Sequence, residues 1–203
     1  MKVAHIGATG KVGSKVLDEL LRRGHTVTAI SRHPQKTPAH KAVVAAQGDL
    51  SDPDGLAAVV RGHEAVISSA PFTPGSSQQV LDAVRKSQVK RYIAVGGAGA
   101  RARAPGKRLK DSPDIPPAWL PAIKEGAELL RLLRSDHDLD WTYFSPAALI
   151  GPGERTGKFR LGKDQLIAAA DGKSSISYDD YAIALVDELE SPKHIRQRFT
   201  IGY

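Results

Sequence analysis

The sequence contains no cysteine in its 203 residues. Disulfides, thiolate metal ligands and a cysteine nucleophile are therefore excluded. Aromatic residues make up only 5% of the chain, which leaves little surface on which nucleic-acid bases could stack. No apolar run approaches the ~18 residues of a membrane span. Because Met1 to Ile6 lead directly into a glycine turn, we expect no signal peptide. We therefore expect a cytoplasmic protein without a membrane segment.

Positive charge is in excess, because 29 lysines and arginines stand against 22 aspartates and glutamates, for a formal net charge of +7. A basic balance suits either a nucleic acid or a phosphorylated small ligand. The densest cationic run lies between Arg101 and Lys110, where proline and glycine are typical of a solvated loop; a lid or a partner contact is the alternative. With so few aromatic residues, we expect a small-molecule ligand and no nucleic acid.

The sequence lacks the residue patterns that metal binding and hydrolase catalysis need. The seven histidines are scattered, and none forms a His-x-x-x-His pair on a predicted helix, so we expect no metal site. Ser68, Ser69 and Ser145 do not lie in a G-x-S-x-G turn, so we expect no hydrolase triad.

Short β-branched runs alternate with helical patterns, which is typical of a parallel sheet built from βαβ units. We expect strands at Lys2–Ile6, Thr26–Ile30, Ala42–Ala46, Glu64–Ser69, Arg91–Val95 and Trp141–Phe144, and a last, edge strand at Arg198–Ile201. Helices are expected at Lys11–Arg23, Pro53–Val60, Ser76–Ser87, Pro121–Arg134 and Tyr178–Leu189. The stretch from Ala98 to Pro117 has no periodicity and is typical of a functional or mobile loop.

A glycine motif joins the first strand to the first helix. Glycine permits the positive φ angles of a tight turn and lets the backbone approach a pyrophosphate, which then lies at the helix N-terminus. The spacing is G-x-x-G-x-x-G rather than the commoner G-x-G-x-x-G, and a purely structural turn is the alternative. The motif predicts a single doubly wound α/β domain of Rossmann type over residues 1–203, with residues 151–203 covering the substrate side. Its cofactor-binding candidates are Gly7, Thr9, Gly10, Lys11 and Val12.

Several motifs together resemble the atypical short-chain dehydrogenases/reductases with NAD(P)H-binding domains. This group includes the bacterial NADH-flavin-reductase-like proteins and is similar to biliverdin reductase B and the NmrA-like proteins. The resemblance covers nearly the whole chain. It rests on Gly7-Ala8-Thr9-Gly10-x-x-Gly13, Gly48-Asp49-Leu50, Asp140-Trp141-Thr142 before Ser145-Pro146, the run from Gly151 to Lys158, and Ile176-Ser177 before Asp180-Tyr181-Ala182.

The end of the second strand bears on the choice of cofactor. A carboxylate about 20 residues after the glycine turn would bind the ribose 2′-hydroxyl of NAD and repel a 2′-phosphate. Here the strand ends without an acid, at Ser31-Arg32. Arg32 can pair with a phosphate in a bidentate manner, and Ser31 can add a hydroxyl donor. We therefore expect NADP(H) rather than NAD, with a solvated surface arginine as the alternative.

Further candidates follow the other strands. The resemblance implies that Asp49 and Leu50 contact the adenine, although Asp49 could instead cap a turn. Small residues lie at the carboxyl edge of the sheet, where ligands of doubly wound folds bind, and leave space for ribose and nicotinamide. These cofactor-binding candidates are Ser69, Ala70, Pro71 and Gly97, together with Pro146 after the sixth strand.

The tyrosine acid/base of ordinary short-chain dehydrogenases is missing. That tyrosine precedes a lysine by four residues, but here Leu120 precedes Lys124. Alcohol oxidation, epimerisation and dehydration are therefore disfavoured. Lys124 is the candidate catalytic residue and a cofactor-binding candidate, because it could contact the nicotinamide ribose or donate a proton. An exposed pair with Glu128 is the alternative.

These observations favour an NADPH-dependent reductase of a flavin, a quinone or a similar conjugated acceptor. In such a reaction the cofactor supplies the hydride and the protein orients the two rings, so no enzyme nucleophile is needed. A non-catalytic NADP(H)-sensing or partner-binding protein is the alternative, and it fits the missing tyrosine equally well. We expect a monomer or a homodimer.

Overall fold

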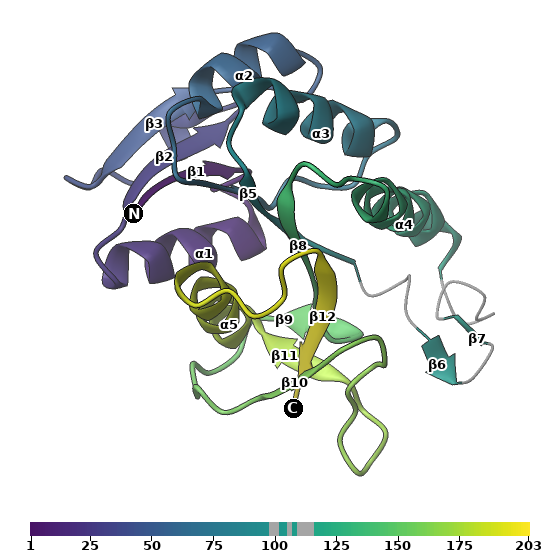
Figure 1. Cartoon of the computed structure of the whole chain (residues 1–203). Helices are drawn as coiled ribbons and strands as arrows, with labels where there is room; N and C mark the ends of the chain where they lie inside the picture. Colours follow the sequence, from purple (N-terminus) through teal and green to yellow (C-terminus); the bar gives the residue numbers. More distant parts are fainter. Residues whose placement is uncertain (98–101, 105–106, 109–115) are drawn as a thin grey trace.

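The computed structural model describes residues 1–97, 102–104, 107–108 and 116–203. Within these residues, the centre of the protein is an eight-stranded sheet of order β10-β12-β8-β5-β4-β1-β2-β3 (Figure 1). Neighbouring strands are parallel except β10, which runs antiparallel to β12. The strands are β1 Lys2–Ile6, β2 Thr26–Ser31, β3 Val43–Gln47, β4 Ala65–Ser68, β5 Arg91–Val95, β8 Asp140–Ser145, β10 Arg160–Gly162 and β12 Gln197–Gly202.

The strand order confirms the doubly wound α/β fold. The chain builds outward from β1 through β2 to β3, then returns to β4 on the other side of β1. Ligands of such sheets bind at this reversal, outside the carboxyl ends of the strands. The two strands at the reversal, β1 and β4, are buried on both faces almost throughout, as parallel strands covered by helices on both sides must be.

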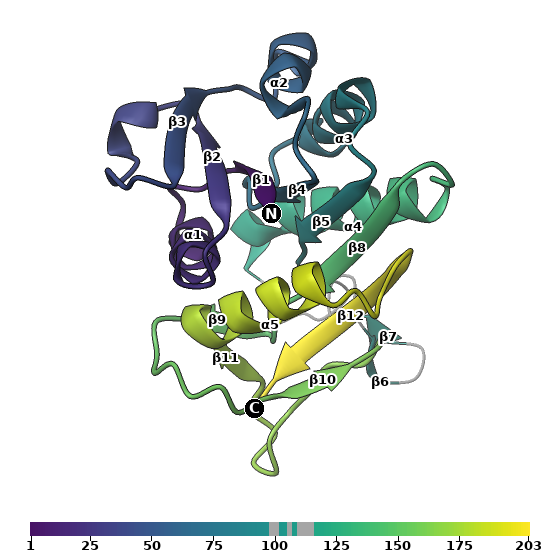
Figure 2. The ribbon, with the colours of Figure 1, turned by 60° about the vertical axis from the view of Figure 1, so that its left-hand side comes forward.

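Helices cover both faces of the sheet (Figures 1 and 2). Alternate residues of β1 point to opposite faces, so Val3 packs in a core with α1 and α5, whereas Ala4 packs in a second core with α2, α3 and α4. None of these helices is long and apolar enough to cross a membrane, as far as the described residues go. The helices are α1 Lys11–Arg22, α2 Pro53–Val60, α3 Ser76–Ser87, α4 Leu120–Arg134 and α5 Tyr178–Glu190, with short 3-10 turns at Pro34–Lys36 and Pro117–Trp119.

Two sequence expectations need correction. The segment Arg198–Ile201 was expected at an edge, but it belongs to β12, which is flanked by β8 and by β10. Three-residue β10 is too short to give a periodic signal. The stretch from Ala98 to Pro117 was expected to be irregular, yet β6 Ala102–Ala104 and β7 Lys107–Arg108 pair antiparallel. The other residues of the basic run from Arg101 to Lys110, and all of its side chains, lie outside what is described.

The C-terminal part of the chain adds a small parallel pair. β9 Leu149–Gly151 follows the carboxyl end of β8, and β11 Ser175–Ser177 runs directly into α5. Figure 2 shows this pair beside the start of α5. Ser177 caps α5, since its Oγ accepts a hydrogen bond from the Asp180 amide at 3.0 Å. That residues 151–203 cover a substrate stays a prediction.

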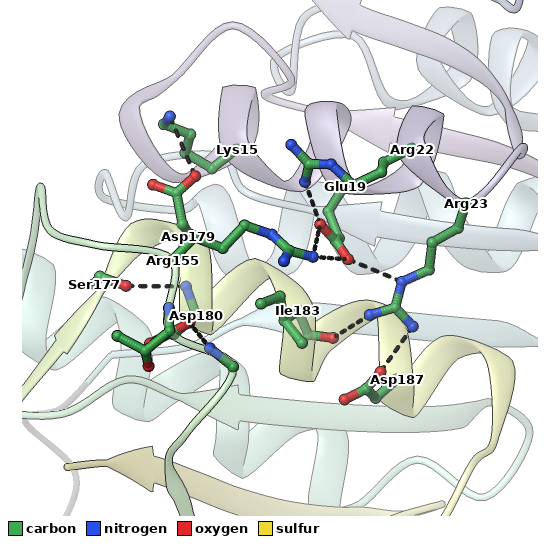
Figure 3. Close-up of polar contacts among 12 residues, drawn as sticks. Lys15, Glu19, Arg22, Arg23, Arg155, Ser177, Asp179, Asp180, Ile183 and Asp187 are labelled. Carbon is green, nitrogen blue, oxygen red and sulfur yellow. Dashed lines mark hydrogen bonds and ion pairs between the residues drawn. The ribbon is translucent and has the colours of Figure 1, made fainter.

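A buried carboxylate on α1 anchors the connection between β9 and β10 (Figure 3). The Glu19 side chain is only 2% exposed. It accepts hydrogen bonds from Arg22 at 2.6 Å, from Arg23 at 2.9 Å, and from Arg155 Nη2 at 3.0 Å to both oxygens. Burial raises the pKa of Glu19, but the guanidinium hydrogen bonds, Arg155 first, outweigh burial and leave the pKa below its usual value.

Asp180 holds the same connection from the other side. Its buried carboxylate accepts hydrogen bonds from the amides of Thr156 and Gly157 at 2.9 and 2.8 Å, from Thr156 Oγ1 at 2.6 Å and from Tyr203 Oη at 2.8 Å. The motif at 151–158 and the motif at 176–182 therefore contact each other. The contacts of both motifs fix the connection between β9 and β10 against α1 and α5.

Glu19→Gln should lower the free energy of unfolding by about 1–3 kcal/mol, because an amide cannot accept charge-assisted hydrogen bonds from three guanidinium groups and leaves a buried polar atom unmatched. Urea unfolding followed by circular dichroism measures the change. The matched control is Glu128→Gln, because Glu128 pairs with Arg131 on the surface of α4. The control should leave the unfolding midpoint nearly unchanged; equal effects of the two substitutions would contradict the assignment.

Candidate functional site

The turn after β1 is held by backbone contacts that exclude larger residues. Gly7 has φ +79°, and its amide donates to Ile30 O at 2.9 Å. A Cβ at Gly7 would lie 2.8 Å from the carbonyl atoms of Ser69, and a Cβ at Gly13 would lie 2.1 Å from Gly7 O. Both contacts are with backbone that cannot move aside. The first and last glycines of the motif are therefore required by packing between β1, α1 and the end of β4.

The N-terminus of α1 is open. Its cap residue Gly10 is exposed and offers no side-chain cap, and the first turn contains no acidic residue. The amides of Lys11, Val12 and Gly13 have no acceptor within the helix, as in the first turn of every α-helix. With the exposed Lys11 and half-buried Thr9 beside them, these amides form the kind of site that binds a phosphate or another anion.

Ser31 ends β2, and its Oγ is buried without a hydrogen-bond partner among the described residues. Arg32 is exposed, and no aspartate or glutamate occurs from there to Gly48. The end of β2 thus carries positive charge and no carboxylate of its own, whereas Asp49, after the neighbouring β3, is close enough for the charge of Arg32 to act on it.

Asp49 is engaged locally. Its Oδ1 accepts hydrogen bonds from the amide and hydroxyl of Ser51 at 2.9 and 2.8 Å. These bonds, with a smaller contribution from the charge of Arg32, hold the pKa of Asp49 below its usual value. Asp49 therefore caps a turn, which was the alternative to an adenine contact. An adenine contact through the remaining oxygen stays a prediction.

Leu50 meets the residues that follow β4, although twenty residues separate them in sequence. A narrow crevice has Leu50, Ala70 and Pro71 among its lining residues, together with Phe72 and the start of α3. The crevice opens at the carboxyl edge of the sheet, next to the Gly7–Ser69 contact. The fold therefore brings Leu50, a predicted adenine contact, together with Ala70 and Pro71, which were predicted to leave space for the ribose and nicotinamide.

Tyr143 connects the end of β5 to α4. Its hydroxyl accepts from the Gly97 amide at 3.0 Å and donates to Gly126 O at 2.8 Å. A Cβ at Gly126 would lie 3.2 Å from this hydroxyl oxygen. Sequence reasoning missed Tyr143, because a tyrosine within an apolar strand looks like core until the hydroxyl is seen to reach a helix. Pro146 is buried just after the same strand.

The carboxylate of Glu125 fixes the same helix to the loop before α3. It accepts hydrogen bonds from the Ser77 amide at 2.8 Å and from the Gly75 amide at 3.2 Å. Glu125 and Gly126 thus set the position of α4 at the carboxyl edge of the sheet. Sequence reasoning assigned no role to Glu125.

Lys124 is exposed on α4. It lies about 200° around the helix from Gly126, which faces the sheet, so only its long side chain can bring the ammonium toward the sheet edge. Glu128 pairs with Arg131 at 2.6 Å rather than with Lys124. The alternative for Lys124, a surface pair with Glu128, is therefore not formed, because Glu128 pairs with Arg131 instead. A contact between Lys124 and a cofactor stays a prediction.

His5 is a residue that sequence reasoning did not single out. It is fully buried on β1, and its Nε2 lies 2.9 Å from Ser69 Oγ. Burial lowers the pKa of His5 to about 3, so the imidazole is neutral in the folded protein at ordinary pH. A histidine in an otherwise apolar central strand was the available signal.

Comparison with known proteins identifies the family. A model of the NAD(P)H-binding family matches residues 7–192, so the chain belongs to this family, and the resemblance found in the sequence is confirmed. The Bacillus subtilis protein YwnB is 36% identical, with 99% of this chain and 98% of YwnB covered.

Two crystal structures are also similar over the full length. A candidate epimerase from Bacteroides thetaiotaomicron is 45% identical, covers 100% of this chain and 96% of its own, and has a TM-score of 0.95. A candidate NADH-flavin reductase from Streptococcus pneumoniae is 36% identical, covers 100% and 99%, and has a TM-score of 0.82.

The burial of neutral His5 should make the protein less stable in acid. The unfolded histidine takes up a proton near pH 6.5 and the folded one only near pH 3, so stability is lost as the pH falls through this window, by up to about 1.4 kcal/mol per pH unit. His5→Leu should remove this contribution, whereas Ser69→Ala, which keeps His5 buried, should retain it. Urea unfolding between pH 7 and pH 4 measures how the free energy of unfolding changes with pH in the wild type and the two variants. The same pH dependence in the wild type and His5→Leu would contradict the prediction.

Proposed function

We propose that this protein is an NADPH-dependent reductase that transfers hydride directly to a flavin, a quinone or a similar conjugated acceptor. The observation that carries the proposal is the open N-terminus of α1, held at the reversal of the sheet by glycines that no other residue could replace. Membership of the NAD(P)H-binding family supports it. The similarity to a candidate NADH-flavin reductase points to the acceptor class.

The described residues fit such a dinucleotide. The first-turn amides of α1 would hold the pyrophosphate, and Asp49 and Leu50 would contact the adenine. Ala70 and Pro71 would leave space for the ribose and nicotinamide. Ser31 and Arg32 would hold the 2′-phosphate, because both lie at the end of β2, which carries no acid of its own. The nicotinamide end would lie toward Gly97, Pro146 and Lys124. NADPH supplies the hydride when it is bound.

The protein itself contributes orientation and the exclusion of water. Leu120 begins α4 where a tyrosine acid/base would act, and it has no ionisable group. A reduced flavin or quinone can take its proton from solvent, whereas an alkoxide from a ketone needs an acid at the site. The same reasoning disfavours epimerisation, the activity in the name of the Bacteroides relative.

A screen of NADPH oxidation against flavins, quinones, ketones and aldehydes should show turnover with the first two classes and little with the others. Absorbance at 340 nm follows the reaction. Faster turnover of simple ketones would overturn the direct-hydride proposal, because an acid would then have to be present. Tight NADPH binding without turnover of any acceptor would favour the NADP(H)-sensing alternative, which the absence of an ionisable group at Leu120 also permits.

Arg32→Ala should weaken NADPH binding by about 1.5–3 kcal/mol and leave NADH binding unchanged, because only NADPH carries the 2′-phosphate that would pair with the guanidinium. Fluorescence titration with both cofactors measures the two affinities. The control is Lys90→Ala, which removes an exposed cation at the amino end of β5. Equal weakening of both cofactors, or an NADH preference in the wild type, would refute the phosphate contact.

Lys124→Ala should raise the apparent KM for NADPH several-fold with little change in the pH profile, because we assign Lys124 to cofactor placement. A proton-donor role would instead lower kcat by about 10²–10⁴ and remove an ionisation from the profile. Steady-state kinetics with a fixed acceptor distinguish the two. Lys124→Arg keeps the charge and should retain the KM; a large loss of kcat in both variants would contradict placement.

A further inference from the structure

A polar pair lies directly beneath the glycine turn. His5 is on β1 two residues before Gly7, and its Nε2 is 2.9 Å from Ser69 Oγ at the end of β4. The Ser69 backbone is the same surface on which Gly7 packs, with 2.8 Å between its carbonyl atoms and the position of a Cβ on Gly7. The Ser69 hydroxyl therefore lies beside the point where a dinucleotide would pass over the turn.

The position of the imidazole proton follows from the surroundings. Neutral His5 has one N–H, and its Nδ1 is buried without a hydrogen-bond partner among the described residues. A buried N–H without an acceptor is rarer in proteins than an acceptor without a donor. The proton therefore belongs on Nε2, which then donates to Ser69 Oγ. The Ser69 hydroxyl proton is left to point elsewhere, since its oxygen has no other partner in the part of the chain that is described.

We propose that His5 is a positioning residue that turns the Ser69 hydroxyl into a fixed hydrogen-bond donor for an acceptor oxygen of the dinucleotide above Gly7. This inference rests on the proposed function, because it needs a ligand in the glycine turn. This role accounts for the burial of a histidine with an unpartnered Nδ1, which packing alone leaves unexplained. A leucine would fill the same place in the core without burying an unmatched ring nitrogen.

A double-mutant cycle on NADPH affinity tests the coupling. Ser69→Ala should weaken binding about 5–10-fold, because one donor is lost, and His5→Leu should weaken it about 3-fold, because the hydroxyl can then rotate away. The double variant should bind as Ser69→Ala does, since His5 acts only through Ser69. His5→Gln, which can place an amide donor near the position of Nε2, should recover most of the affinity lost in His5→Leu.

A second measurement needs no variant. Long-range ¹H–¹⁵N spectra of the wild-type protein should show His5 in the Nε2–H tautomer with and without NADPH. The Nδ1–H tautomer, or losses that add in the double variant, would overturn the role of His5 while leaving the proposed function intact. Failure of the wild type to bind either NADPH or NADH would overturn the proposed function, and this inference with it.

Discussion

The contact between the glycine turn and the end of β4 is the constraint on which the rest of the structure depends. Gly7 lies against the Ser69 backbone and Gly13 lies against Gly7 O at distances that leave no room for a Cβ. This double contact sets how closely α1 can approach the sheet and where its first turn points. Because the first-turn amides then face the carboxyl edge at the strand reversal, one steric requirement produces both the packing and the open helix N-terminus.

The other side of the site is fixed by polar contacts rather than by steric ones. Tyr143 joins Gly97 to Gly126, and Glu125 joins α4 to the loop before α3. Two segments that lie far apart in sequence are thereby brought to the same edge as the glycine turn. Lys124 owes its location to these neighbours. The Lys124 side chain leaves α4 on the side away from the sheet, and this direction weakens the argument that it contacts the cofactor.

The C-terminal part is attached through compensated buried charge. Arg155 reaches Glu19 on α1, and Asp180 gathers the backbone of Thr156 and Gly157. Buried carboxylates are tolerated only when their oxygens are fully engaged. Here that requirement fixes the loop after β9 on the outer side of α1 and α5. Motifs that point to the family can thus be part of its framework.

The sequence by itself determined the doubly wound fold, the glycine turn and the family, because these depend on local signals: strand and helix periods, and glycines at fixed offsets. It also placed the candidates from Gly7 to Val12, and those after β2 and β4, at one edge, since parallel strands end together. Only the tertiary structure decided that β12 is internal, that Asp49 bonds to Ser51 and that Lys124 faces outward. The His5–Ser69 and Glu19–Arg155 pairs also emerged only there, because these contacts join residues 64 and 136 positions apart and no local pattern encodes which side chains meet across the fold.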